Sequence, residues 1–292
     1  MPQGLMVVNA FLKTNKFDEI YLTLLEAARA CQMELEVKTN AEVICELAEK
    51  SFPSYSFVLF WDKDVQLAMQ LERLGLRLFN SADSILRCDD KALTYLTLKG
   101  EEIPMPETII APKTFSNIGY PRLDFVKRVG DALGFPLVLK ECFGSFGQQV
   151  YWIPTREALE RKVAELAGTP MLFQKPVTES LGRDARLNVV GGRIVASILR
   201  RSTDGDFRSN LSRGGAMEPY TPTREESALA VRASQKLGLD FAGVDVLFGK
   251  EGPVLCEVNS NAHFKTTLQC TGVNMALDIM RHIARKMEKN NE

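Results

Sequence analysis

The chain has 292 residues, with 36 Lys and Arg against 37 Asp and Glu, which gives a formal net charge of −1. Its 45% hydrophobic and 25% charged residues are typical of a globular protein of two or three domains, and the balanced charge does not favour nucleic-acid binding. Since no stretch reaches 18 apolar residues and the N-terminal apolar run is too short for a signal segment, we expect neither membrane insertion nor export.

The cysteines and histidines limit the redox and metal chemistry. The six cysteines are scattered without a CxxC pair, which is typical of reduced thiols in a cytoplasmic protein. There are only two histidines, His263 and His282. A metal would therefore be held mainly by oxygen atoms, which favours Mg²⁺ or Mn²⁺.

The first 80 residues predict a parallel sheet flanked by helices. Apolar runs at 5–8, 35–37 and 57–61 alternate with helical patterns, and residues 17–31 carry apolar side chains at helical spacing along one face. This order indicates a βαβαβ unit. No GxGxxG follows the first predicted strand, so dinucleotide binding is not expected.

The pattern changes after residues 80–81 to two short helices and then to an extended segment around Pro104 and Pro106. Beyond Pro136, predicted strands come in pairs joined by glycine-containing turns: 137–141 with 150–153, 184–190 with 193–200, and 243–248 with 253–259. Such hairpins predict antiparallel sheets in α+β domains. We expect three parts, at 1–85, 86–172 and 173–292.

The last hairpin is the most informative segment for chemistry. If residues 250–252 form a three-residue loop, Asp245 lies directly opposite Glu257, and both share a face with Asn259 while even-numbered residues such as Cys256 form the apolar face. Two carboxylates about 5 Å apart repel, so a positive group is expected between them. Two carboxylates and an amide suit Mg²⁺ bound to phosphate oxygens. The alternative is a solvated polar face of an exposed hairpin.

A lysine and a glycine-rich turn form the second candidate. Lys140 ends an apolar strand and precedes the turn at 144–147, an arrangement that places an ammonium group and backbone N–H groups around phosphate. It is not a Walker A loop, because no Gly-Lys-Ser/Thr opens a helix. The alternative is an edge-strand lysine beside glycines that only serve the turn.

Residues 183–213 hold seven arginines against three aspartates, which implies an anionic ligand in an otherwise neutral chain. A two-residue turn at 191–192 would put Asp184, Arg186 and Asn188 on one face. The following loop supplies Arg208, Asn210 and Arg213, groups that suit phosphate or carboxylate recognition. A basic surface loop is the alternative. His263 is either an acceptor-site residue or a packing residue, and His282 is expected to be structural.

In this order, these segments resemble the ATP-grasp superfamily, and specifically its RimK-like carboxylate–amine ligases. The resemblance spans residues 80 to about 275. The matching segments are Asn80-Ser81, Cys88-Asp89-Asp90-Lys91, Leu139-Lys140 with the glycine turn at 144–147, Gln174 within 172–177, residues 182–186 and 189–192, residues 206–215, and Gly243-Val244-Asp245 with Glu257-Val258-Asn259.

The resemblance implies an ATP-grasp fold, in which an α/β domain precedes two α+β subdomains with antiparallel sheets that clamp ATP. It also implies a set of residue roles. Lys91 and Lys140 would contact ATP phosphates beneath a loop of Gly144, Ser145, Phe146 and Gly147; Gln174, Lys175, Pro176 and Val177 would form the strand beside adenine; Asp184 would bind the ribose; Asp245, Glu257 and Asn259 would hold one or two Mg²⁺ or Mn²⁺ ions; and Arg208, Asn210 and Arg213 would neutralise the carboxylate and its acyl phosphate.

The reaction implied by the resemblance joins an amino-acid carboxylate such as glutamate to an amine, which is a small molecule, a peptide or a protein C-terminus, with ADP and phosphate released. Two departures concern specificity. Lys175 stands where the family commonly has Glu, which would change one adenine contact but not the backbone pairing. Residues 260–265 replace an Ala-Ser-Pro-Gly segment, so the amine acceptor stays open. Two rival functions are a catalytically silent nucleotide-binding scaffold and a small-molecule kinase. Neither a nucleic-acid nor a membrane partner is expected, and homo-oligomerisation is left open.

Overall fold

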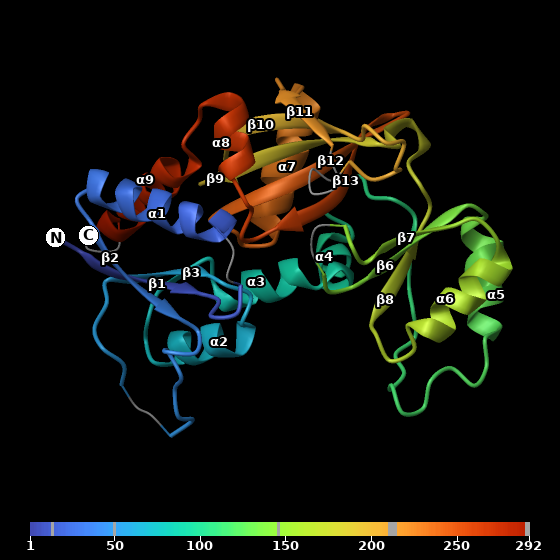
Figure 1. Cartoon of the computed structure of the whole chain (residues 1–292), viewed down its shortest axis with the longest axis horizontal. Coiled ribbons are helices and arrows are strands. Elements are labelled where there is room, and N and C mark those ends of the chain that lie inside the picture. Colours follow the sequence, from blue (N-terminus) through green and yellow to red (C-terminus); the bar gives the residue numbers. More distant parts are fainter. Residues whose placement is uncertain (13–14, 49–50, 145–146, 210–214, 290–292) are drawn as a thin grey trace.

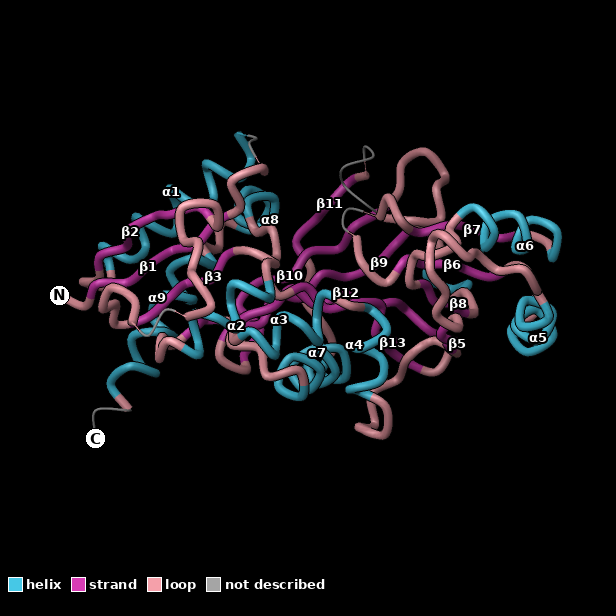
Figure 2. The backbone as a smooth tube through the Cα atoms, turned by 90° about the horizontal axis from the view of Figure 1, so that it is seen from below, coloured by secondary structure: helices cyan, strands magenta, loops and turns pink. Residues whose placement is uncertain are grey.

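The computed structural model describes residues 1–12, 15–48, 51–144, 147–209 and 215–289. Three sheets succeed one another along the long axis of the molecule, and the C-terminal sheet lies between the other two (Figures 1 and 2). The fold prediction is confirmed: a parallel α/β part precedes two antiparallel sheets.

The N-terminal sheet is parallel, with strand order β2-β1-β3-β4. Its elements are β1 (Gln3–Val8), α1 (Asn15–Ala30), β2 (Glu34–Thr39), β3 (Phe57–Trp61), α2 (Val65–Arg73), β4 (Leu78–Phe79) and α3 (Ala82–Asp89). Side chains alternate across β1, so that Met6 packs against α1 while Leu5 and Val7 pack against α2 and α3. Because both faces are covered, β3 is apolar throughout and β1 is apolar after the exposed Gln3.

The central sheet is antiparallel, with order β5-β8-β6-β7. Its elements are β5 (Thr108–Ile110), α5 (Asp124–Leu133), β6 (Leu137–Glu141), β7 (Val150–Ile153), α6 (Arg156–Glu165) and β8 (Met171–Gln174). Helices α5 and α6 pack against this sheet through a separate apolar cluster. The sheet extends to Gln174, two residues beyond the expected boundary at 172.

The C-terminal sheet has order β11-β10-β9-β12-β13. Its strands and helices are η1 (Thr178–Ser180), β9 (Arg183–Val190), β10 (Arg193–Arg201), β11 (Ala216–Pro219), α7 (Arg224–Lys236), β12 (Phe241–Gly249), β13 (Gly252–Asn259), α8 (Lys265–Thr271) and α9 (Met275–Glu288). One face packs on α7 and on α4 (Lys91–Leu98). α4 therefore belongs by packing to this sheet, although it precedes the central sheet in sequence.

Helix α9, near the C-terminus, packs against elements from the N-terminal part of the chain. Its buried side chains, including Ile279 and Met280, share a cluster with α1 and with Trp61 of β3. Trp61 stacks on Phe241 of β12 at a ring separation of 5.5 Å. Asn80 adds polar ties, since its amide nitrogen donates to the carbonyls of Phe241 and Ser260, both at 3.0 Å. The N-terminal sheet is thus packed directly on the start of β12 and the end of β13.

The turn between β9 and β10 confirms its prediction. Val190 pairs with Arg193, and Gly191 and Gly192 have φ values of 56° and 73°, as a two-residue turn of this hand requires. A Cβ on Gly191 would lie 2.5 Å from Nδ1 of His282, so glycine also makes room for α9.

The β12–β13 hairpin differs from its prediction near the turn. Asp245 does pair with Glu257, as expected, but Gly249 pairs with Gly252, which leaves a two-residue loop instead of three. A β-bulge absorbs the difference: Val246 pairs with Leu255, and Cys256 is the extra residue. Leu255 is therefore in the core, and Cys256, expected on the apolar face, lies on the side of Glu257.

Candidate active site

A cleft of about 800 Å³, counting space open to solvent, separates the central sheet from the C-terminal sheet. It gathers many of the residues that the sequence singles out. From the central side come Lys140, Gly147, Gln174, Lys175, Pro176 and Val177, and from the C-terminal side Asp184, Arg208, Asp245 and Glu257. Ser145, Phe146, Asn210 and Arg213 lie outside the described residues.

Lys140 is a buried cation that the central sheet contributes to the cleft. It leaves the end of β6, is 7% exposed, and places Nζ 3.9 Å from Sγ of Cys256. Burial by itself lowers the pKa of a lysine, but acidic groups facing it, among them Glu257 and Asp245, raise the pKa of Lys140 above its usual value. The ammonium group is therefore charged and faces acceptors, which suits a phosphate-binding role.

The strand that leaves the central sheet forms one wall of the cleft. Gln174 is buried, and its Nε2 donates to Oγ1 of Thr108 at 2.9 Å. Lys175 points outward to Glu107, with 2.7 Å between Nζ and Oε1, and both side chains are more than half exposed. Substitution of the expected Glu by Lys at 175 thus adds a surface ion pair and leaves the cleft wall intact.

Two aspartates and two arginines form a buried network across β10, β9 and β12. Arg186 donates to both oxygens of Asp245 at 2.6 Å, and Arg200 donates to Asp245 at 2.9 Å. Arg200 also binds Asp184 through two bonds of 2.6 and 2.7 Å, and Ser209 donates to the same carboxylate at 2.5 Å. Two guanidinium groups therefore neutralise Asp245, whereas the positive group expected between Asp245 and Glu257 stays a prediction.

The charge of Asp245 follows from this network. Burial raises the pKa of a carboxyl group, but the guanidinium groups of Arg186 and Arg200 outweigh burial and hold the pKa of Asp245 below its usual value. The carboxylate is therefore ionised at neutral pH. The sequence did not identify Arg200 as its partner, although Arg200 is one of the seven arginines in the basic segment.

The donors on the hairpin fit a hard cation by type. Asp245 of β12 pairs with Glu257 of β13, Asn259 lies two residues further along β13, and Nδ2 of Asn259 donates to Oε1 of Glu257 at 3.1 Å. Carboxylate and amide oxygens are the ligands that Mg²⁺ accepts. No group of three His, Cys, Asp or Glu gathers as a metal site in the described ranges, so an ion here would need Asn259.

Arg208 connects the two sides of the cleft. Its Nη1 donates to the carbonyls of Gly147 at 2.9 Å and Val150 at 3.0 Å, while Nε and Nη2 donate to Asp206. The loop after β10 is thus attached to the glycine-rich turn after β6. The guanidinium group that the resemblance assigns to the carboxylate and its acyl phosphate is occupied by protein acceptors in this structure.

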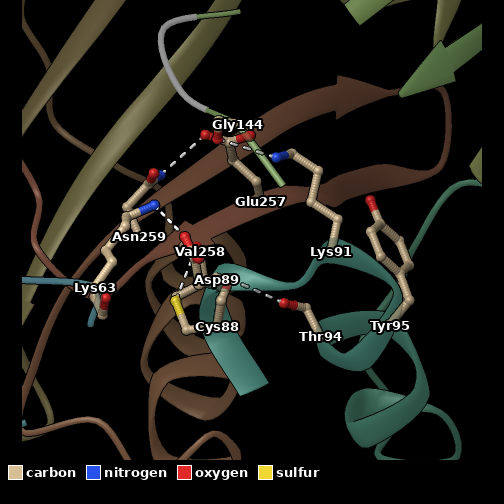
Figure 3. A pocket seen from close by; sticks show the side chains of 11 residues that line it. Lys63, Cys88, Asp89, Lys91, Thr94, Tyr95, Gly144, Glu257, Val258 and Asn259 are labelled. Atoms are coloured by element: carbon tan, nitrogen blue, oxygen red, sulfur yellow. Dashed lines mark hydrogen bonds and ion pairs between the residues drawn. The ribbon is translucent and has the colours of Figure 1, made fainter. Parts of the chain in front are cut away.

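A second, smaller pocket adjoins the cleft and shares Glu257 with it (Figure 3). Lys91 opens α4, and its Nζ donates to the carbonyl of Gly144 at 3.3 Å. Asn259 lines the same pocket, together with two residues that sequence reasoning left without a role, Lys63 and Asp89. Lys63 is the second residue after β3, and a lysine just beyond the carboxyl end of a parallel strand is the signal that could have identified it.

The two histidines lie outside both pockets. The ring of His263 meets the ring of Phe17 edge to face at 5.6 Å, and Nε2 of His282 is 2.6 Å from Asp240. Among the residues that the structure describes, no helix is both long and apolar enough to cross a membrane.

Comparisons with known proteins agree with this geometry. Residues 88–283 match the RimK-like ATP-grasp domain. An uncharacterised protein of Mycoplasma pneumoniae is 31% identical over 266 residues, covering 89% of this chain and 92% of that protein. N-acetylaspartylglutamate synthase A of Homo sapiens is 40% identical over 208 residues, covering 70% of this chain and 51% of the synthase, so the match spans about half of the human protein.

A solved structure extends the likeness to the whole fold. The RimK-domain ATP-grasp protein of Sphaerobacter thermophilus superposes with a TM-score of 0.73 at 21% identity, covering 96% of this chain and 98% of that one. The fold agrees over the N-terminal, central and C-terminal sheets. Since the family match covers two thirds of the chain and includes the lining of both pockets except Lys63, the chain belongs to the RimK-like ATP-grasp family of ATP-dependent carboxylate–amine ligases, as the sequence predicts.

Proposed function

We propose that the protein joins a carboxylic acid to glutamate or a similar amino acid through an acyl-phosphate intermediate, with ATP converted to ADP and phosphate. The observation that carries this proposal is the cleft in which a buried lysine, an adenine-sized strand edge and the Asp245–Glu257 pair face one another. The human relative supports glutamate as a substrate, because its name describes the synthesis of an amide that contains glutamate.

In this proposal the nucleotide lies along the cleft. The backbone at residues 174–177 binds the adenine edge, and Lys140 and Lys91 bind phosphate oxygens under the glycine turn at 144–147. Asp184 binds the ribose, a contact that requires one oxygen to turn from Arg200 or Ser209. One or two Mg²⁺ ions held by Asp245, Glu257 and Asn259 supply neutralisation of the phosphate charge.

The residues of the chain then favour transfer of the γ-phosphoryl group to the donor carboxylate. Positive charge from the buried Lys140 and Arg200 faces the oxygens on which negative charge accumulates. When the amine nitrogen attacks the acyl carbon, the C–O bond to phosphate breaks and phosphate leaves with the electron pair. Arg208, with Asn210 and Arg213, neutralises the acyl phosphate once it exchanges Gly147 and Val150 for the ligand.

Two further features belong to the proposal. The substrates are a carboxylic acid and an amine of small-molecule or peptide size, because both binding places are concave pockets rather than broad open surfaces. A cytoplasmic location accords with the six free cysteines.

The proposal is tested by ADP release from the purified chain with Mg²⁺, screened over carboxylic acids with and without amino acids. A ligase requires both substrates and gives an amide mass, and hydroxylamine traps its acyl phosphate. Glu257→Gln should lower turnover by at least about a hundredfold, whereas Glu251→Gln, in the turn of the same hairpin, should keep wild-type turnover. ADP release that needs a hydroxyl substrate would indicate a kinase, and ATP binding without turnover under any pairing would indicate a scaffold.

A further inference from the structure

The pocket beside the nucleotide cleft contains two charged residues that the proposed nucleotide contacts do not use. Lys63 enters from the carboxyl end of β3, and Asp89 from the end of α3. The two side chains form an ion pair, and Figure 3 shows them below Asn259 and Glu257. Their side chains are 37% and 17% exposed. The pair is thus accessible from solvent and directly adjoins the hairpin that carries the reaction.

Helix capping does not explain the position of Asp89. The neighbouring Asp90 caps α4, since its Oδ1 accepts from the backbone N–H groups of Ala92 at 2.8 Å and Leu93 at 3.3 Å. Lys91 reaches the carbonyl of Gly144. Of the charged residues in the 88–91 segment, only Asp89 points to the N-terminal sheet, where it meets Lys63.

Lys63 is held in place by the loops around it. Its backbone N–H donates to Oδ1 of Asp62 at 2.7 Å, and Nδ2 of Asn9 donates to the same carboxylate at 3.1 Å. Nδ2 of Asn261, two residues beyond Asn259, donates to the carbonyl of Asp62 at 2.7 Å. The backbone that carries Lys63 is therefore tied to the loop that follows the proposed metal ligands.

The strand order points to a ligand at the same place. In the order β2-β1-β3-β4 the chain leaves β1 towards one side and β3 towards the other, and the crevice outside the carboxyl ends of such a strand pair is where α/β sheets bind ligands. Asn9, Asp62 and Lys63 follow these two strand ends. The sheet thus presents a positive charge to the pocket from a rigid edge.

We propose that this pocket binds the amine substrate as an α-amino-acid zwitterion, with Lys63 binding the α-carboxylate and Asp89 the ammonium group. The inference rests on the proposed ligase function and names the residues that select its second substrate. In the ligand-free structure each residue of the pair takes the place of one end of the zwitterion. A donor with several carboxylates would be repelled by Asp89, so the opposite charges favour the amino acid at this position.

The test compares substrates that differ by one charged group. Glutamate carries both groups, 4-aminobutyrate lacks the α-carboxylate, and glutarate lacks the amine. Lys63→Ala should raise KM for glutamate about tenfold, the worth of one charge-assisted contact, with KM for ATP unchanged and KM for 4-aminobutyrate unchanged. Asp89→Asn should raise KM for both amines. Lys236→Ala removes a comparable, partly exposed ion pair with Glu101 that is remote from the pocket, and it should leave KM for glutamate and KM for 4-aminobutyrate unchanged.

A charge-swapped variant separates recognition from a structural strut between the sheets. Lys63→Asp with Asp89→Lys rebuilds the ion pair and should restore resistance to urea, while glutamate affinity, measured by calorimetry with a non-hydrolysable ATP analogue, stays low. Recovery of that affinity in the swapped protein would overturn the inference. So would wild-type glutamate affinity in Lys63→Ala, even with ligase turnover intact. Lys63-dependent glutamate binding without ADP release under any pairing would instead contradict the proposed function and leave the pocket assignment standing.

Discussion

Arg200 connects the two buried aspartates of the cleft, and its removal gives the sharpest test of that network. We predict that Arg200→Met lowers the free energy of unfolding by about 3–5 kcal/mol, since breaking a buried ion pair leaves an uncompensated charge. Three charge-assisted bonds are lost, two to Asp184 and one to Asp245. Asp245 keeps both bonds from Arg186, whereas among the described residues Asp184 keeps a side-chain bond from Ser209 alone, so most of the cost arises at Asp184.

This reasoning predicts the behaviour of a double variant. Arg200→Met with Asp184→Asn removes the stranded charge together with its partner and should recover about 1–3 kcal/mol relative to the sum of the two single variants. The adjacent Arg201 is a matched control, because it projects to solvent and pairs with Glu218 at 3.3 Å with both side chains about half exposed. Arg201→Met should cost less than about 1 kcal/mol.

Urea unfolding followed by tryptophan fluorescence measures these differences. Trp61 stacks on Phe241 of β12 and Trp152 packs against Phe207, so the two tryptophans report on the C-terminal sheet and on the loop after β10. An Arg200→Met protein within 1 kcal/mol of wild type, or an Arg201→Met protein equally destabilised, would refute the argument that the buried network holds β10 to β12.

Two further predictions concern ionisable groups in the cleft. Because its pKa is lowered in the folded protein, Asp245 adds stability that is present above its unfolded pKa of about 3.9 and is lost as pH falls through the lower folded value. The difference in the free energy of unfolding between wild type and Asp245→Asn should therefore narrow below about pH 4 in acid-unfolding curves. A difference that widens there would contradict the assignment. Cys256 and Cys270 are both partly exposed, but burial raises the pKa of Cys256 to about 11, so iodoacetamide should label Cys256 more slowly than Cys270 at pH 7.5. ATP should slow the labelling of Cys256 further, as peptide mass spectrometry can show, and fastest labelling at Cys256 would count against a raised pKa in the cleft.

The hairpin of β12 and β13 shows how far alternation of apolar and polar residues determines a site. Alternation and an expected three-residue loop predicted the pairing of Asp245 with Glu257. The observed loop has two residues, and the pairing still holds because the bulge at Cys256 restores the expected register at that pair. The same reasoning misplaced Cys256. A bulge adds one residue to one strand without changing the composition, so the pattern on each side of it looks regular, and only the packing of Leu255 reveals it.

Long-range partners were beyond sequence reasoning for a different reason. The pattern showed that Asp245 needs a cation, and the arginine excess in 183–213 showed that cations were near, but the choice of Arg186 and Arg200 depends on the register of β9 against β12, 59 residues apart along the chain for Arg186. Likewise, α4 packs against the C-terminal sheet although it precedes the strands of the central sheet along the chain. Nothing local in residues 91–98 distinguishes the two sheets as packing partners.

The arginines that neutralise Asp245 also bear on how a metal site here would act. A carboxylate offers about four lone-pair positions, and three are taken by Arg186 and Arg200, so an ion at Asp245 would meet a ligand already fixed in direction. Glu257 differs, since within the described ranges its carboxylate has a single hydrogen bond, from Asn259. The hairpin thus pairs one rigid and one adjustable ligand, and the adjustable one is shared by the nucleotide cleft and the pocket of Lys63 and Asp89. A ligand bound in one pocket would therefore affect the other pocket through the position of Glu257.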